Sequence, residues 1–129
     1  MYCIVDIETT GGNAKRNKII EIGACLHDGN QVVDTFHSHV NPGVTIPPFI
    51  TRLTGINDDM VANAPGFEEL AEDFYDFLDG HIFIAHNVSF DYGFIKHHFA
   101  EADIQYNSNR LCTVRLSRKI IPGLPSYSL

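Results

Sequence analysis

Two carboxylates stand two residues apart near the start of the chain, within the run MYCIVDIETTGG. The residues around them are apolar and typical of a buried strand, in which residues i and i+2 project from the same face. Asp6 and Glu8 are therefore predicted to lie side by side, while Val5 and Ile7 point the other way. Two like charges this close repel each other, which favours a divalent cation between them.

A third carboxylate, Asp91, falls in the first turn of a predicted helix much later in the chain. A carboxylate at that position stabilises a helix N-terminus, so Asp91 taken alone is interpreted as structural. Combined with Asp6 and Glu8 it completes a set of oxygen ligands suited to Mg²⁺ or Mn²⁺.

Three strands are predicted to position the first two acids. The sequence indicates strands over residues 2–8, 18–26 and 32–40, with a polar loop over 11–17. Asp28 and Gly29 are a strong hairpin signal, so all three strands should be antiparallel. The Pro- and Gly-rich stretch that follows predicts a loop with one or two short helical turns, the first starting near Pro47.

Helices and one further strand account for the remaining residues. Apolar side chains at helical spacing, with acids on the opposite face, predict an amphipathic helix between Pro65 and Gly80. Residues 81–86 (HIFIAH) predict a short strand, and Ser89 is the expected N-cap of a helix that runs to about Ala102. A last helical piece is expected over residues 113–121. This order of elements predicts a mixed sheet with packed helices, an α/β or α+β domain.

Composition narrows the class of protein. A chain of 129 residues with 44% hydrophobic residues suits one globular domain. No apolar run approaches the roughly 20 residues of a membrane span. Because the N-terminus also lacks the pattern of a secretion signal, a cytoplasmic protein with no membrane partner is expected. The three cysteines are far apart, so neither a disulfide framework nor a thiolate zinc site is expected.

The formal net charge of -7 argues against broad electrostatic adhesion to nucleic acid. It does not exclude a nucleic-acid enzyme, because carboxylates that bind cations are neutralised by them. The basic residues gather in two groups, namely Lys15, Arg16 and Lys18, and Arg110, Arg115, Arg118 and Lys119. Either group could touch a nucleic-acid backbone, although a solvated charged surface is the simpler interpretation of each.

Two motifs together resemble a known family. DIETTG (6–11) and HNVSFD (86–91) are similar to the first two exonuclease motifs of the DEDD family of 3′→5′ exonucleases, which includes the proofreading epsilon subunit of bacterial DNA polymerase III. Further segments resemble the family in the same order: KIIEIGA (18–24), NPG and IPP (41–48), LTGIND (53–58) and SYSL (126–129). The resemblance therefore covers essentially the whole chain.

This resemblance implies an α/β, ribonuclease H-like fold, with a five-stranded mixed sheet, flanking helices and the first carboxylates on the central strand. It also implies two divalent metal ions, Mg²⁺ or Mn²⁺. Asp6 would bridge both ions, Glu8 would hold the ion that activates water, and Asp91 would support the second ion. The implied activity is two-metal-ion hydrolysis that removes nucleoside monophosphates from DNA 3′ ends, in proofreading or repair.

The resemblance further implies substrate contacts around the 3′-terminal nucleotide. The predicted contacts are Thr9, Thr10, Gly11, Gly55, Ile56, His86, Asn87 and Phe90. Simpler interpretations exist for several of them: Ile56 and Phe90 as core residues, and Asn87 as a turn residue. Glu21, a further carboxylate in the second strand, is expected to be structural.

The family's third motif, a histidine followed five residues later by aspartate, does not follow the SYSL segment, because the sequence stops there. His86 and Asp91 share that spacing but belong to the second motif. His98 and Asp103 share it at a helix end, where residues five apart do not readily converge. The general base and fourth carboxylate are thus absent. Residues 1–129 are expected to be one exonuclease domain, incomplete at its C-terminus and inactive, or nearly so, alone.

Other functions stay open at this stage. The chain could be an RNA-trimming 3′→5′ exonuclease, since nothing in the sequence reports how a 2′ hydroxyl is treated. It could also be a non-catalytic nucleic-acid-binding or polymerase-docking module. An endonuclease of the ribonuclease H-like group is disfavoured by the spacing of Asp6 and Glu8. The expected partners are a single-stranded DNA 3′ end or frayed primer terminus, and a DNA polymerase or a fused nuclease domain.

Overall fold

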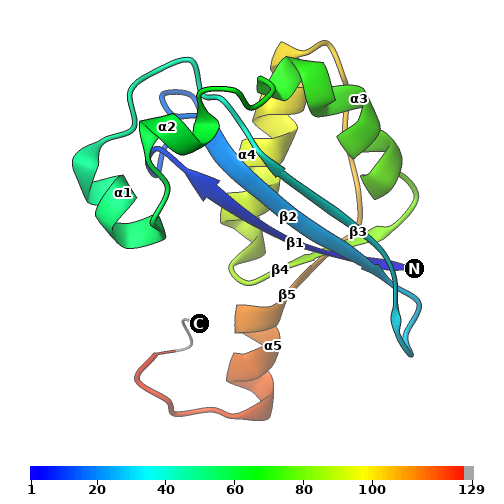
Figure 1. The fold of residues 1–129 in the computed structure, drawn as a ribbon. Coiled ribbons are helices and arrows are strands. Elements are labelled where there is room, and N and C mark those ends of the chain that lie inside the picture. Colours follow the sequence, from blue (N-terminus) through cyan, green and yellow to red (C-terminus); the bar gives the residue numbers. More distant parts are fainter. Residues whose placement is uncertain (127–129) are drawn as a thin grey trace.

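A five-stranded sheet forms the centre of the computed structural model, which describes residues 1–126 (Figure 1). Its strands are β1 (Tyr2–Thr9), β2 (Ile19–His27), β3 (Val32–His39), β4 (Ile82–Ala85) and β5 (Arg110–Cys112). Their order in the sheet is β3-β2-β1-β4-β5, with β1 to β3 antiparallel and β4 and β5 parallel to β1. The predicted mixed sheet, with β1 at its centre, is confirmed.

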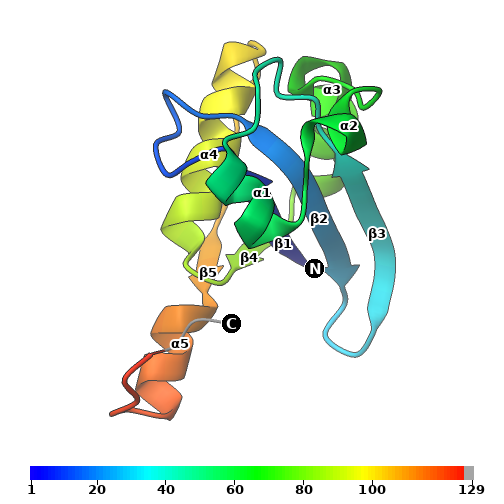
Figure 2. The same ribbon diagram turned by 60° about the vertical axis from the view of Figure 1, so that its left-hand side comes forward.

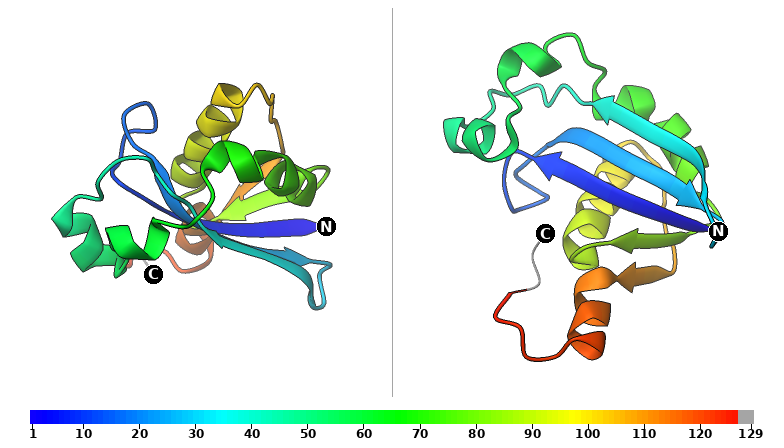
Figure 3. Two further views of the ribbon diagram at one scale, coloured as in Figure 1. Left: turned by 45° about the horizontal axis from the view of Figure 1, so that its top comes forward. Right: turned by 60° about the horizontal axis from the view of Figure 1, so that its bottom comes forward.

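Five helices flank the sheet in the described residues: α1 (Pro48–Thr54), α2 (Asp58–Val61), α3 (Phe67–Leu78), α4 (Val88–Glu101) and α5 (Thr113–Ile120). Helices α3 and α4 cover one face, whereas α1 and α2 lie beside the carboxyl end of β1 (Figures 1 and 2). Helix α5 leads away from the β5 edge (Figure 3). None of these helices is both long and apolar enough to cross a membrane within the described part of the chain.

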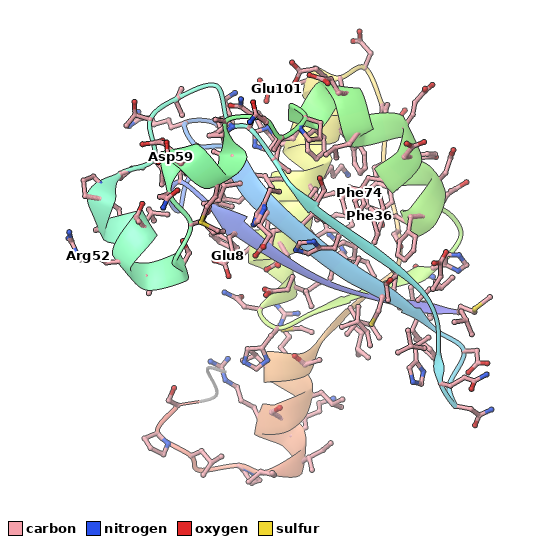
Figure 4. All side chains as sticks on the ribbon, in the orientation of Figure 1. Glu8, Phe36, Arg52, Asp59, Phe74 and Glu101 are labelled. Atoms are coloured by element: carbon pink, nitrogen blue, oxygen red, sulfur yellow. The ribbon has the colours of Figure 1, made fainter. Side chains whose placement is uncertain are left out.

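The main core lies between the sheet and helices α3 and α4. Burial alternates along β1, so that Cys3, Val5 and Ile7 face this core while Asp6 projects from the other face. The ring of Phe74 on α3 is fully buried and lies 5.0 Å from that of Phe36 on β3 (Figure 4). The helix-covered face therefore carries the packing, and the opposite face is free to carry charge.

The hairpin between β2 and β3 forms where it was predicted. The Asp28 carboxylate accepts hydrogen bonds from the N–H groups of Asn30 at 2.8 Å and Gln31 at 2.9 Å. Gly29 adopts a left-handed conformation with φ of 102°. This local chemistry closes the turn, as expected for an Asx-type turn with glycine.

The start of α4 differs from the prediction. Ser89 is not the N-cap but lies inside the first turn of a helix that begins at Val88. The N-cap position belongs to Asn87, whose left-handed backbone (φ 66°, ψ 63°) turns the chain sharply after β4. Asparagine tolerates this conformation better than most residues, which explains why the turn occurs there. Asp91 still falls in the first turn, as predicted.

A bulge in β2 connects the sheet to the two short helices. Thr9 pairs with Ile19 and Glu8 pairs with Glu21, so Ile20 has no partner on β1. The side chain of Ile20 is fully buried in a second, smaller core with Ile46, Ile50, Ile56 and Val61. The bulge therefore anchors α1 and α2 at the end of β1 where the acids stand. The one or two helical turns predicted for the Pro- and Gly-rich stretch are confirmed as α1 and α2.

The SYSL segment lies at the end of the chain, and its residues 127–129 fall outside the described residues.

Candidate active site

The three predicted carboxylates come together at the carboxyl end of β1. Strand β4 pairs with β1 only from Tyr2 to Ile4, which leaves the later part of that β1 edge without a strand partner among residues 1–126. Asp91 takes this place, because its Oδ2 accepts a 3.1 Å hydrogen bond from the N–H of Ile7. Ile7 stands between Asp6 and Glu8 in sequence. One hydrogen bond thus fixes the start of α4 against the strand that carries the other two acids.

Burial, together with neighbouring carboxylates, raises the pKa of all three acids. Burial raises the pKa of Asp91 to about 7, against the lowering effect of the Ile7 N–H, and the Asp6 charge adds to the rise. Burial and then the charge of Glu21 raise the pKa of Asp6. Burial, followed by the charges of Asp6 and Glu21, does the same for Glu8. The site therefore holds more negative charge than its own surroundings neutralise.

A fourth acid, Glu21, stands directly opposite Glu8 across β1 and β2. Its Oε2 lies 3.2 Å from Nε2 of His37 and 3.1 Å from Nε2 of His39. These two histidines were not predicted as site residues from the sequence, although strand alternation places both on one face of β3. They hold the Glu21 carboxylate toward β3, in keeping with the structural role expected for it.

The donor set fits hard divalent cations in its chemistry. The three carboxylates supply oxygen ligands, and no lysine or arginine of residues 1–126 forms an ion pair with them. As the side chains are placed, no group of three or more His, Cys, Asp or Glu residues in that range is arranged to hold a metal ion. Asp91 is tied to β1, whereas Asp6 is exposed and Glu8 half-buried. Joint binding of a cation by these acids would therefore require their side chains to move.

The residues after Glu8 form a closed network of hydrogen bonds. The hydroxyl of Thr9 donates to the carbonyl of Gly11 at 2.8 Å. The hydroxyl of Thr10 donates to Oδ1 of Asn17 at 3.1 Å and accepts from the N–H of Lys18 at 3.0 Å. Both threonines are buried, so their hydroxyls shape the loop. Contact of these residues with a nucleotide stays a prediction.

Gly55 and Ile56 form the end of α1. Gly55 is left-handed (φ 79°), and its N–H donates to the carbonyl of Thr51 at 2.8 Å. Ile56 is only 3% exposed and packs in the smaller core. The structure therefore supports the packing interpretation of Ile56, while a base contact stays a prediction.

The loop that precedes Asp91 is held from two sides. Nδ1 of His86 lies 2.7 Å from Oγ1 of Thr113 at the start of α5. The ring of Phe90 is partly buried against the main core, 4.9 Å from that of Phe94. Asn87 is exposed and serves as the backbone turn described above. These three residues position Asp91, and their contact with substrate stays a prediction.

Comparison with protein families and sequences gives a consistent result. The RNase_T family model, described as exonuclease, matches residues 3–129. The chain is 42% identical over 130 residues to the 3′-5′ exonuclease DinG of Bacillus subtilis strain 168. It is 43% identical over 129 residues to the protein of the same description from Staphylococcus saprophyticus. Each match covers 99% of this chain and 14% of the relative, so the chain spans about one seventh of their length.

Solved structures share the fold. Exonuclease X in complex with 5′ overhanging duplex DNA is 27% identical with a TM-score of 0.79, over 99% of this chain and 68% of that chain. E. coli exonuclease I in complex with a 5cy-dA13 oligonucleotide has a TM-score of 0.82 at 15% identity, over 92% of this chain and 29% of that chain. The second likeness shows the fold alone. The ribonuclease H-like α/β fold predicted from the sequence is confirmed.

Proposed function

The chain belongs to the RNase_T exonuclease family, and from this premise we propose that it is a metal-dependent 3′→5′ exonuclease that removes nucleoside monophosphates from DNA 3′ ends. The observation that carries the proposal is the hydrogen bond from the Ile7 N–H to Asp91, which joins the third carboxylate to the strand of the other two. Proofreading or repair is the expected setting. The free cysteines in the described residues suit a reducing, cytoplasmic location.

Asp6, Glu8 and Asp91 would hold two divalent ions, Mg²⁺ or Mn²⁺. Such ions supply an activated water and stabilise the leaving 3′ oxygen. The chain's own part is to provide oxygen ligands whose repulsion a cation relieves, and to fix one of them rigidly. The fixed ligand is Asp91, held between the Ile7 N–H and the first turn of α4. Asp6 and Glu8 then define the position of the terminal phosphate along β1.

The test is Mn²⁺-dependent release of mononucleotides from 3′-labelled single-stranded DNA, by this chain and by a longer form with the length of its curated relatives. Asp6→Asn and Asp91→Asn should each abolish release by the longer form, and a metal chelator should do the same. A matched control is Asp76→Asn, an exposed acid on α3 that should leave release unchanged.

A longer form that releases nothing from DNA would contradict the proposal. An RNA oligonucleotide of the same sequence, run in parallel, measures the preference between the two sugars. Release from RNA alone would replace the DNA substrate with an RNA one. If neither DNA nor RNA is hydrolysed but the chain still binds them, the remaining interpretation is a nucleic-acid-binding domain.

A further inference from the structure

The charge of the chain is distributed unevenly along its length. Residues 104–129 contain no Asp or Glu, whereas all 16 acids lie before them. The same stretch holds four of the chain's nine Lys and Arg residues, Arg110, Arg115, Arg118 and Lys119. All four are exposed in the structure. An acidic protein thus carries a compact basic surface, formed by these four residues of β5 and α5.

This basic surface begins at the same edge of the sheet as the carboxylates. Strands β4 and β5 run parallel to β1, so their carboxyl ends point in the same direction as the end that carries Asp6 and Glu8. Ligands of open α/β sheets commonly bind outside the carboxyl ends of their strands. The contact between His86 and Thr113 joins the start of α5 directly to the loop that leads into Asp91.

Two adjacent hollows of about 650 and about 560 Å³ lie along the basic surface. Ser89, Cys112 and Arg115 line both of them. Arg118 lines the first, while Arg110 and Lys119 line the second. The four cations therefore border a continuous depression between the start of α4 and the length of α5.

The backbone adds to the positive potential in this depression. Although burial acts to raise the pKa of the Cys112 thiol, N–H groups of Arg115, Val88, Val114 and Asn87 bring it below its ordinary value. These amides belong to the starts of α4 and α5, which are the positive ends of the two helix dipoles. The guanidinium of Arg110 is placed over the ring of Tyr92, 4.4 Å from its centre.

Resting on the proposed function, we propose that Arg110, Arg115, Arg118 and Lys119 bind backbone phosphates of the single strand whose 3′ end lies at the carboxylates. The contacted phosphates lie several nucleotides from that end. The partner is assigned by charge complementarity, since exposed arginines and lysines bind phosphate whatever the base sequence. The rest of the chain holds all 16 acids and only five of the nine Lys and Arg residues, so on balance it would repel the strand and favour this path.

The experiment compares binding of single-stranded DNA of about 4 and about 16 nucleotides by fluorescence anisotropy, on the full chain in EDTA so that nothing is hydrolysed. The test variant is Arg115→Gln/Arg118→Gln. The control is Arg52→Gln/Lys96→Gln, which removes the same charge from exposed residues outside β5 and α5; Arg52 points away from the sheet (Figure 4).

The test variant should bind the longer strand more weakly, by up to about 25-fold at 0.1 M salt, with the salt slope reduced by about 1.4. Binding of the shorter strand should change less than about two-fold. The control should keep the native slope for both. The proposal would be overturned if the two variants lost equal affinity, or if the test variant lost equal affinity for both strand lengths. It would also be overturned if the native chain did not bind the longer strand.

A second comparison separates this proposal from the proposed function. Asp6→Asn should abolish nucleotide release by the longer form yet keep the arginine-dependent binding of the longer strand. If the native longer form releases no nucleotide while Arg115→Gln/Arg118→Gln still weakens binding, the proposal for the basic surface is supported and the proposed hydrolytic function is contradicted. If nucleotides are released but the variant binds the longer strand normally, the hydrolytic function is supported and the proposal for the basic surface is contradicted.

Discussion

At the scale of single residues, the carboxylate of Asp91 is a charge placed where its surroundings oppose it. It is 5% exposed, close to two other acids, and hydrogen-bonded to the backbone N–H of Ile7. Such an arrangement costs stability without a cation, which is common for groups that serve a site rather than the fold. The residue scale is therefore where the proposed function is most directly measurable.

Asp91→Asn should change how stability depends on pH. The folded pKa of Asp91, about 7, lies above the ordinary value of 3.8. Between these values the folded chain binds a proton that the unfolded chain lacks, so stability falls as pH rises through this window and is level above it. In EDTA, the stability measured by urea unfolding should fall between pH 5 and pH 8, and it should fall less in Asp91→Asn, by at most about 2.7 kcal/mol. Parallel pH profiles for the two proteins would contradict this.

Gly11 and Gly12 offer a matched pair in the loop after β1. A Cβ at Gly11 would lie 2.5 Å from Oδ1 of Asn17, whereas one at Gly12 would meet nothing within 4 Å. Gly11→Ala should therefore displace Asn17 from Thr10 and lower the free energy of unfolding by about 1 to 3 kcal/mol. Gly12→Ala should be close to neutral. Thermal unfolding of both variants checks the difference, and equal midpoints would contradict it.

At the scale of elements, the sequence predicted the long, regular pieces well. Alternation in β1 and helical spacing in α3 are strong signals, and both elements form within one or two residues of their predicted bounds. Strand β5 was not identified from its pattern, because three residues are too few to show a period. The error at Ser89 has a different cause: serine is a common N-cap, but the turn after β4 required the left-handed backbone of Asn87.

The site shows the same division. Strand spacing alone predicted that Asp6 and Glu8 share one face. The resemblance of the two motifs to the exonuclease family predicted that Asp91 joins them. The link between Asp91 and Ile7 depends on where β4 stops pairing with β1, which no local pattern reports. The histidines on β3 were likewise missed, since their role depends on a partner from β2.

Helix α3 should depend on one aromatic side chain for its attachment. Phe74 is fully buried and its ring contacts those of Phe36 and Phe99, at 5.0 and 5.7 Å. Phe74→Ala should lower the free energy of unfolding by about 3 to 5 kcal/mol. Phe49→Ala on α1 is the control, because Phe49 is 57% exposed and should change stability little. Denaturant unfolding measures both; similar losses would show that α3 packs less tightly than described.

At the scale of the whole molecule, negative charge at the site couples metal binding to stability. Mn²⁺ that binds only the folded chain should raise the unfolding midpoint, by an amount equivalent to about 2.7 kcal/mol at a concentration one hundred times its dissociation constant. Asp6→Asn/Glu8→Gln should remove most of this rise. Glu72→Gln/Asp76→Asn, exposed acids on α3, should keep it. Differential scanning fluorimetry with increasing Mn²⁺ measures all three, and an equal rise in both variants would show binding elsewhere.

The position of β1 in the sheet has a consequence for synthesis of the protein. Of the five strands described here, β1 is the first to leave the ribosome. It pairs on one side with β2, which follows at once, and on the other side with β4, where Tyr2 is paired with Ile82. Until β4 emerges, β1 is therefore an open edge strand of the nascent meander of β1 to β3, a state that invites pairing with other chains. The edge closes only when β4 and then Asp91 emerge. The late segment that pairs with the open edge of β1 thus also brings the third acid, so under the proposed function a chain synthesised only as far as β3 should release no nucleotide.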